Sequence, residues 1–279
     1  MREVQGVRRA AVAGTWYPGT AEALAAAVDR HLGQTSRDVT GDLVALIAPH
    51  AGLMYSGPVA AHAYRLLRGR TFDAAVIVGP SHFVGFDGVA APGADGFETP
   101  FGVARVDTDL IAALKEHAGA IREHPAAHAR EHSLEMQLPF LQHVAPGIPI
   151  VPLVMGSQTD ATARTLADAL AAVLRGRNAL LVASTDLSHY HDAPTAARLD
   201  AVVLEHVERF DADGLQRALD TRPDHACGGG PTVAVMRAAQ ALGARDAVIL
   251  SYADSSDVSG DKSRVVGYMA AALGNFRQA

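Results

Sequence analysis

Residues 43–52 read LVALIAPHAG, six apolar residues that run into a turn containing proline and histidine. Five further short apolar runs occur along the chain, at residues 74–78, 148–154, 179–183, 247–250 and 265–270. None of them alternates between apolar and polar residues as a half-exposed strand would. Continuous apolarity of this length is typical of strands that are covered on both faces. The six runs therefore predict the strands of a buried central sheet.

Segments with helical spacing lie between these runs, at residues 21–32, 58–67, 108–117, 161–174, 196–210 and 232–242. Pro231 stands directly before the last of them, where the first turn of a helix tolerates proline. The alternation of strands and helices predicts an α/β fold with a mixed, largely parallel central sheet flanked by helices. No linker or repeat divides the chain, so we expect one domain over residues 1–279.

The composition excludes several classes of protein. Lys and Arg number 24 against 30 Asp and Glu, a formal net charge of −6, so we expect neither nucleic acid nor an anionic membrane surface as a partner. A hydrophobic content of 49% is that of a globular chain. The single cysteine cannot form an internal disulfide, and no apolar stretch is long enough to span a bilayer. We therefore expect a soluble, cytoplasmic protein.

Histidines follow three of the predicted strands at the point where each strand ends. They are His50 after the first run, His82 after the second, and His189 after the fourth, in the segment STDLSHY at 184–190. In an open α/β sheet the carboxyl ends of the strands form the ligand crevice. Because histidine is both a common metal ligand and the side chain best suited to proton transfer near neutrality, a metal site or an acid–base pair is expected at this edge.

Two imidazoles alone make a weak metal site, and Cys227 is the candidate for a third ligand. It lies in DHACGGG at 224–230, a loop that leads into the helix predicted after Pro231. The amides at the start of a helix stabilise a thiolate, and glycines allow the backbone to approach a ligand closely. The alternative is that this lone cysteine is a small buried apolar residue.

A second metal motif competes with this interpretation. Residues 128–132 read HAREH and fit H-x-x-E-H, the inverted zinc-peptidase pattern. On one helix, His128 and His132 would share a face with Glu131 beside them as the base, and Glu205 or Glu208 could supply a third ligand. This hypothesis leaves the three histidines at the strand ends unexplained.

Eight blocks of sequence resemble, in order, those of the MEMO family. They are AGTWYP at 13–18, PHAG at 49–52, YSG at 55–57, GPSH at 79–82, EHSLEMQLPFL at 131–141, TDLSHY at 185–190, CG at 227–228 and DVSGD at 257–261. The resemblance extends from about residue 8 to the C-terminus. Bacterial and archaeal members are also called protein B of the AmmeMemoRadiSam system.

This resemblance implies a fold similar to that of class III extradiol (LigB-like) dioxygenases, which are non-haem iron enzymes. Carried over by motif, it implies that His50 and His82 are metal ligands and that Cys227 takes the third position. It implies that His189 is the acid–base group with Asp186 beside it, and that His132 lines the site as a further catalytic histidine.

The cysteine departs from the two-histidine, one-carboxylate set of the dioxygenases. Because thiolate is a softer ligand, copper or zinc is compatible with the site as well as iron, the metal that the resemblance implies first. The expected function is that of a metal-binding, dioxygenase-like oxidoreductase acting on an unknown small substrate. A non-catalytic module that binds a peptide or protein in the same crevice is the alternative. The resemblance also implies AMMECR1-type and radical-SAM proteins as partners.

Overall fold

The centre of the molecule is a nine-stranded mixed sheet in the computed structural model, which describes residues 6–35 and 39–277. Its strands are β2 (Gly41–Ala48), β3 (Ala74–Pro80), β4 (Val89–Ala91), β7 (Ile121–Glu123), β8 (Ile150–Met155), β9 (Ala179–Ser184), β10 (His189–His191), β11 (Asp246–Asp254) and β12 (Val265–Phe276). Their order is β10-β12-β2-β9-β3-β8-β4-β7, and β11 pairs with β12. All six apolar runs form strands of this sheet, which confirms the α/β prediction.

The middle of the sheet is parallel and its flanks are mixed. Strands β2, β9, β3 and β8 run parallel to one another, whereas β12 is antiparallel to β2 and β4 is antiparallel to β8. Every residue of β3 and β8 is buried, which is why their sequences show no alternation. The register pairs Ala48 of β2 with Ser184 of β9. The carboxyl ends of β2, β9 and β3 therefore lie next to one another.

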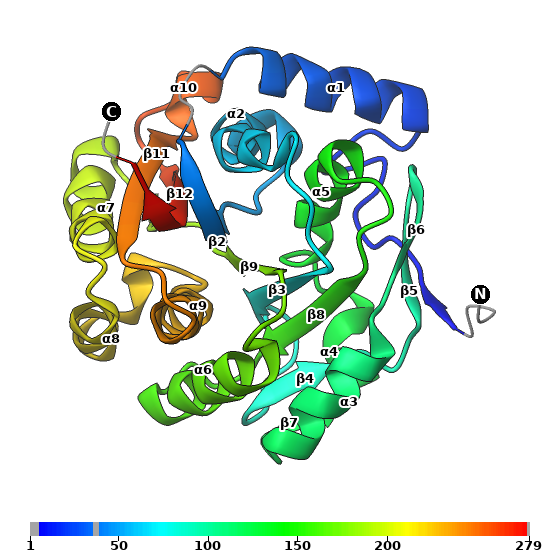
Figure 1. Ribbon diagram of the computed structural model, residues 1–279. Coiled ribbons are helices and arrows are strands. Elements are labelled where there is room, and N and C mark those ends of the chain that lie inside the picture. Colours follow the sequence, from blue (N-terminus) through cyan, green and yellow to red (C-terminus); the bar gives the residue numbers. More distant parts are fainter. Residues whose placement is uncertain (1–5, 36–38, 278–279) are drawn as a thin grey trace.

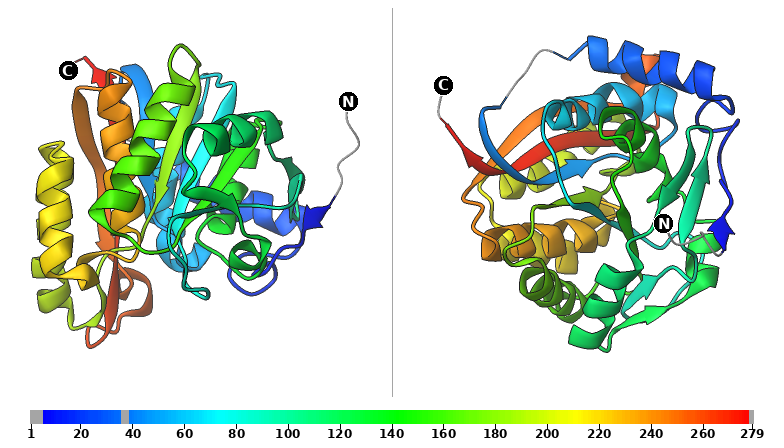
Figure 2. Two further views of the ribbon diagram at one scale, coloured as in Figure 1. Left: turned by 90° about the horizontal axis from the view of Figure 1, so that it is seen from below. Right: turned by 45° about the vertical axis from the view of Figure 1, so that its right-hand side comes forward.

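Helices cover both faces of the sheet (Figures 1 and 2). The longer ones are α1 (Ala21–Gly33), α2 (Leu53–Tyr64), α3 (Thr108–His117), α6 (Asp160–Leu174), α7 (Ala193–Glu208), α8 (Ala212–Thr221) and α9 (Gly229–Ala241), and the short ones are α4 (Pro125–Ala129), α5 (Leu138–Val144) and α10 (Ser256–Ser259). Helix α2 packs on β12, β11 and β2, with α1 outside it. Helices α7 and α9 pack on the other face, and α6 and α8 pack against α9. Within the described ranges, no helix has the length and apolarity needed to cross a membrane.

The predicted helices are confirmed, but the second begins earlier than expected. Helix α2 starts at Leu53, and Pro58, the expected first residue, lies inside it. Its first amide is satisfied from a distant part of the chain, since Leu53 N–H donates to the carbonyl oxygen of Trp16 (2.8 Å). This contact holds residues 14–18 against the start of α2.

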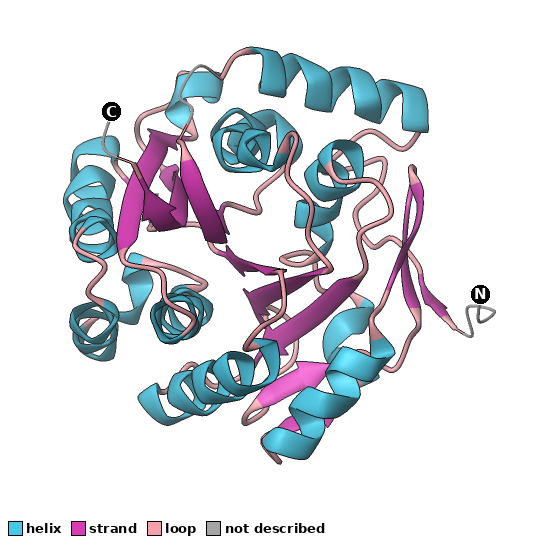
Figure 3. Cartoon of the chain, viewed as in Figure 1, coloured by secondary structure: helices cyan, strands magenta, loops and turns pink. Residues whose placement is uncertain are grey.

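The sequence patterns did not predict a second, smaller sheet. It consists of β1 (Val7–Arg8), β5 (Gly96–Thr99) and β6 (Gly102–Arg105), and it lies at the edge of the molecule, apart from the main sheet (Figure 3). Strand β1 pairs with β5 in parallel. The first described residues are thereby fixed to the body of the protein.

Candidate metal centre

Three histidines stand at the carboxyl ends of the adjacent strands β2, β3 and β9, as predicted. His50 follows β2 and is buried, His82 follows β3 and is partly exposed, and His189 opens the short strand β10 shortly after β9. His50 is close enough to both other rings for their charges to lower its pKa, although burial is the larger cause of that lowering. The edge of the sheet therefore gathers imidazoles that are far apart in the sequence.

Hydrogen bonds fix how His50 presents its ring. Its Nδ1 lies 2.9 Å from Ser184 Oγ, and that hydroxyl donates its proton to the carbonyl oxygen of Ser133 (2.6 Å). Since the hydroxyl has only one proton, it accepts from His50, so the imidazole carries its proton on Nδ1. Nε2 carries the lone pair, and Cys227 Sγ lies 3.3 Å from it. Because burial and the neighbouring histidines lower the pKa of His50 well below its ordinary value, the ring is neutral.

His82 is held by the buried carboxylate of Glu131. Its backbone N–H donates to Glu131 Oε2 (2.7 Å) and its Nδ1 lies 2.8 Å from Oε1. Burial alone would raise the pKa of Glu131, but hydrogen bonds from His82 and Ser133 outweigh it and lower the pKa to about 2. The ionised carboxylate can only accept, so His82 also carries its proton on Nδ1 and presents Nε2.

His189 follows the same pattern, with a backbone oxygen in place of a side chain. Its Nδ1 lies 2.8 Å from the carbonyl oxygen of Leu187, which requires the proton on Nδ1 and leaves Nε2 free. Burial lowers the pKa of His189. Asp186, which the resemblance placed beside it, instead accepts a hydrogen bond from the backbone N–H of His50 (2.7 Å). Burial raises the pKa of Asp186 to about 7.

His132 is buried beside His82. Its ring stacks on His82 with centroids 4.5 Å apart and planes 22° apart, and the centroid of the Trp16 indole lies 4.4 Å from it. Burial and the charge of His82 lower the pKa of His132 to about 4, so it is neutral near pH 7. His50, His82 and His132 form a cluster whose ligand atoms all lie within 4.8 Å of one another, close enough to hold a metal ion.

Ring orientation separates the members of this cluster. A metal ion lies close to the plane of each imidazole that ligates it, because the nitrogen lone pair lies in that plane. The planes of His50 and His82 are 79° apart, as are those of His50 and His132, so either pair can meet at one ion. The nearly parallel, stacked planes of His82 and His132 converge far beyond a ligating distance, so as oriented they do not both ligate the same ion.

Cys227 lies beside His50, at the start of α9. Its Sγ is 3.3 Å from His50 Nε2, and the backbone N–H of Asp186 donates to it at 3.3 Å. Gly228 makes this approach feasible, since a Cβ there would lie 2.3 Å from the carbonyl oxygen of Ser184. Burial and the Asp186 carboxylate raise the pKa of Cys227 well above its ordinary value, so the group is a thiol.

The zinc-peptidase arrangement is not formed. Helix α4 ends at Ala129, so His128 and His132 do not share a helical face. The Nε2 of His128 lies 3.0 Å from the carbonyl oxygen of Ala90, inside the protein. Glu131, the expected base, is engaged by His82 and Ser133.

Sequence reasoning missed the groups that orient the histidines. The sequence places Glu131 in the peptidase motif and Ser184 at the end of a predicted strand, and it links neither residue to a histidine of the site. Gln137 also contributes, since its amide donates to Ser184 Oγ (2.7 Å) and to the carbonyl oxygen of Pro49 (3.0 Å). The signal available was the acidic and amide residues of the EHSLEMQ block, but nothing in the sequence indicates which histidine each of them contacts.

A buried carboxylate, Asp200 of α7, supports the segment that carries His189. Its Oδ1 accepts from the backbone N–H of Ser188 (2.9 Å) and its Oδ2 from the hydroxyl of Tyr252 (2.9 Å). Gly267 leaves room for it, since a Cβ there would lie 2.0 Å from Oδ2. Burial raises the pKa of Asp200.

Because the pKa of Asp200 is raised, the stability of the folded protein should depend on pH. Above the ordinary aspartate pKa of about 3.9 the unfolded chain loses a proton that the folded chain retains, so the folded state loses stability as pH rises through the raised value. Urea unfolding from pH 3.5 to 8 should show the stability of wild type falling relative to Asp200→Asn. Asp192→Asn is the control. Hydrogen bonds from Thr195 lower the pKa of Asp192, so the stability of wild type should instead rise with pH relative to this variant. Parallel curves for wild type and Asp200→Asn would contradict the prediction.

Comparison with known proteins identifies relatives over nearly the whole chain. The family model described as Memo-like protein matches residues 8–272. A MEMO1 family protein of Methanopyrus kandleri is 39% identical over 94% of this chain and 97% of its own length, and one of Methanothermobacter thermautotrophicus is 36% identical over 94% and 98%. The crystal structure of an uncharacterized Escherichia coli K12 protein matches 84% of this chain and all of its own with a TM-score of 0.58. At 17% identity that match supports the fold alone.

Proposed function

The chain belongs to the Memo-like protein family, and we propose that it is a metal-dependent oxidoreductase acting on a small oxygen-bearing substrate. The observation that carries the proposal is the set of imidazoles at the ends of adjacent strands, those of His50, His82 and His189. The pKa values of His50 and His189 are lowered, so these two rings are neutral near pH 7. Each ring donates from Nδ1, and Nε2 keeps the lone pair that could ligate an ion; at His50 that atom lies 3.3 Å from Cys227 Sγ. Neutral imidazoles with one fixed tautomer are what a metal site requires.

We assign the ligands as His50, His82 and Cys227. The ring plane of His50 is 79° from those of both His82 and His132, so it can share an ion with either of them, and the stacking argues only against His82 and His132 together. We take His82 because the family motif places a ligand there. Cys227 Sγ lies 3.3 Å from the nitrogen that His50 presents, which supports it as the third ligand. Cys227 is not a member of the group whose ligand atoms all lie within 4.8 Å of one another, so a mononuclear site with two nitrogens and one sulfur requires its Sγ to move closer to His82.

Iron is the metal we propose first, by analogy with the dioxygenase-like fold. The thiolate makes the set softer than two histidines and a carboxylate, so copper(I) and zinc are the competing ions. When bound, the ion would supply Lewis acidity and, in the case of iron, access to oxygen chemistry.

The remaining residues have separable roles. His189 Nε2 is unprotonated and free to take a proton from a substrate hydroxyl, while the carbonyl oxygen of Leu187 fixes the ring. His132 is neutral, lies 5.6 Å from His50 between ring centroids, and can donate a hydrogen bond to an anionic group in the crevice. Trp16 packs against His132 and limits access of water on that side.

The alternative function is a binding module for a peptide or protein in the same crevice. One observation favours it: Trp16, Phe83 and Tyr190 are large aromatic side chains that contact the site histidines and are 39%, 48% and 65% exposed. Aromatic residues are enriched in interfaces. AMMECR1-type and radical-SAM proteins are the partners we would test. Binding that persists after complete removal of metal would favour this alternative.

Metal content of protein purified without oxygen tests the ligand set. Wild type loaded with Fe(II) should retain one ion per chain, and Cys227→Ser, His50→Ala and His82→Ala should lose it while remaining folded by circular dichroism. His128→Ala is the matched control, because His128 is buried outside the cluster. Full metal content in Cys227→Ser would remove the thiolate from the ligand set. Loss of metal in His128→Ala with retention in His50→Ala would favour the peptidase.

Oxygen uptake in a substrate screen would separate an enzyme from a binding module, provided that the uptake disappears in His189→Ala.

A further inference from the structure

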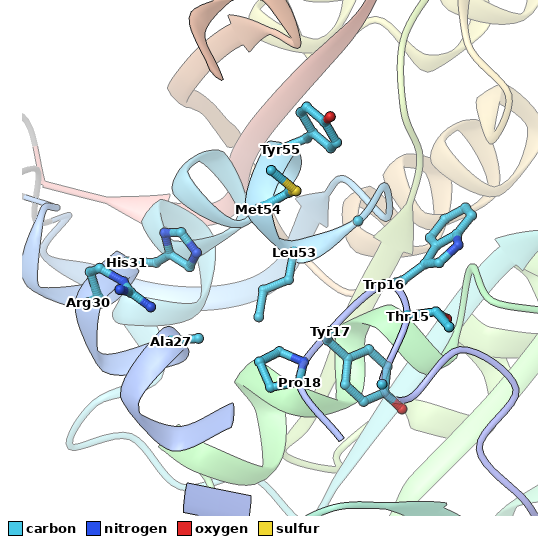
Figure 4. Close-up of a pocket in the computed structure, with 12 residues that line it drawn as sticks. Thr15, Trp16, Tyr17, Pro18, Ala27, Arg30, His31, Leu53, Met54 and Tyr55 are labelled. Carbon is cyan, nitrogen blue, oxygen red and sulfur yellow. The ribbon is translucent and has the colours of Figure 1, made fainter. Parts of the chain in front are cut away.

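A cavity of about 750 Å³ lies beside the metal centre but is formed by other residues. It is open to solvent and is lined by the loop at 14–18, one side of α1 and the start of α2 (Figure 4). Its volume is within the range of roughly 300–1,000 Å³ that is usual for small-molecule sites. Neither the cluster histidines nor Cys227 line it. The proposed metal chemistry therefore makes no use of this cavity.

Hydrogen bonds within the protein hold the walls in place. Trp16 accepts a hydrogen bond from the first amide of α2 through its carbonyl oxygen, and Gly14 N–H donates to the carbonyl oxygen of Tyr17 (2.8 Å). The Tyr17 hydroxyl donates to the buried Glu135 (2.6 Å). A preformed wall reduces the ordering cost of binding.

The two ends of the cavity differ in chemistry. Trp16, Pro18, Leu53 and Met54 give an apolar surface, and Met54 is 61% exposed although it is a large apolar residue. Arg30 stands at the far end from Trp16 (Figure 4). An apolar wall that ends in one guanidinium is complementary to an amphipathic anion.

Arg30 is available to such a ligand. It is exposed, and within residues 6–35 and 39–277 no carboxylate pairs with it. Its neighbour Asp29 is engaged by His143 (2.8 Å). The adjacent His31 adds no second charge near pH 7, since burial and Arg30 lower its pKa. The cavity therefore offers a single positive charge, which matches a monoanion better than a doubly charged phosphate.

We propose that this cavity binds a small amphipathic carboxylate, with its apolar part against Trp16, Leu53 and Met54 and its carboxylate on Arg30. A guanidinium–carboxylate pair is charge-assisted and can be bidentate, so it supplies orientation as well as affinity. The site is independent of the proposed metal reaction, although Trp16 forms a wall of the cavity and also contacts His132.

The chain carries its own reporter, because Trp16 is its only tryptophan. Trp16 fluorescence can be followed while octanoate is added. In a parallel titration, 1-octanol serves as an uncharged ligand with the same chain length. Wild type should bind octanoate about tenfold or more tightly than octanol, since a hydrogen bond to a charged group is the stronger kind. Arg30→Gln should remove this preference by weakening octanoate alone. Ala27→Leu, which narrows the cavity from α1, should weaken both ligands.

Two control variants separate the outcomes. Arg217→Gln changes an exposed arginine on α8, away from the cavity, and should bind both probes as wild type does. His50→Ala disrupts the proposed metal site and should also leave octanoate binding unchanged, so failure of the metal proposal would be visible separately. Equal affinity of wild type for octanoate and octanol would overturn the proposal. So would unaltered octanoate binding in Arg30→Gln, or loss of octanoate binding in His50→Ala.

Discussion

Replacement of Glu135 by Gln is expected to lower the free energy of unfolding by about 3–5 kcal/mol, the usual cost of removing one partner from a buried ion pair. Glu135 is fully buried and pairs with the guanidinium of Arg8, which is itself buried. With the charge removed, Arg8 would remain inside the protein without a counterion. The desolvation of that lone charge is the main source of the expected loss.

The other contacts of Glu135 make glutamine a poor substitute. Its carboxylate accepts from the backbone N–H groups of Ala11 (2.8 Å) and Val12 (3.1 Å) and from the hydroxyl of Tyr17 (2.6 Å). Burial and the hydrogen bond to Glu135 raise the pKa of Tyr17 far above its ordinary value, so that hydroxyl is a donor at any relevant pH. A glutamine would place an NH₂ group, itself a donor, among these donors. We therefore expect the segment at 8–17 to loosen.

Urea denaturation measures this loss, and Glu205→Gln provides the matched control. Glu205 pairs with Arg209 one helical turn away on the surface of α7, with both side chains more than 60% exposed. The same substitution there should cost no more than about 0.3–0.5 kcal/mol. A Glu135→Gln variant whose free energy of unfolding lies within about 1 kcal/mol of wild type would contradict the prediction.

The sequence was sufficient to predict the sheet because its strands are buried on both faces. Residues 74–78 and 148–154 are apolar without interruption, and β3 and β8 are buried throughout. The histidines after β2 and β3 could be placed at one edge for the same reason, since parallel neighbours end at the same side of a sheet. Topology alone therefore brought His50 and His82 together.

The contacts that orient the site could not be predicted in this way. His82 and Glu131 are 49 residues apart, and Arg8 and Glu135 are 127 apart. Such pairs depend on how loops fold over the end of the sheet, and no periodic pattern describes a loop. The motif at 128–132 misled for a related reason, because its spacing is meaningful only on a helix and the helix ends at Ala129. Helix α2 was placed too late because its first amide is satisfied by Trp16 rather than by a local cap.

Replacement of Glu131 by Gln is expected to weaken metal binding 10- to 100-fold, the usual effect of losing a group that orients a metal-bound histidine. This prediction rests on His82 as a ligand. The Glu131 carboxylate is buried and ionised, and it accepts from both Nδ1 and the backbone N–H of His82. It therefore keeps the proton on Nδ1 and Nε2 free. A glutamine fills nearly the same volume, but its amide can turn to donate to Nδ1, which would move the proton to Nε2 and block the ligating atom.

Two measurements distinguish this role from a structural one. Competition with a chelator gives the affinity for Zn²⁺, which is redox-inert, and nitrogen NMR of the metal-free protein gives the tautomer of His82. The affinity loss should accompany the appearance of an Nε2-protonated His82, while Glu205→Gln leaves both unchanged. If Glu131→Gln binds Zn²⁺ within twofold of wild type, His82 is either not a ligand or is oriented without the carboxylate. Loss of affinity with the tautomer unchanged would instead indicate that the charge of Glu131, rather than its control of the proton, strengthens the site.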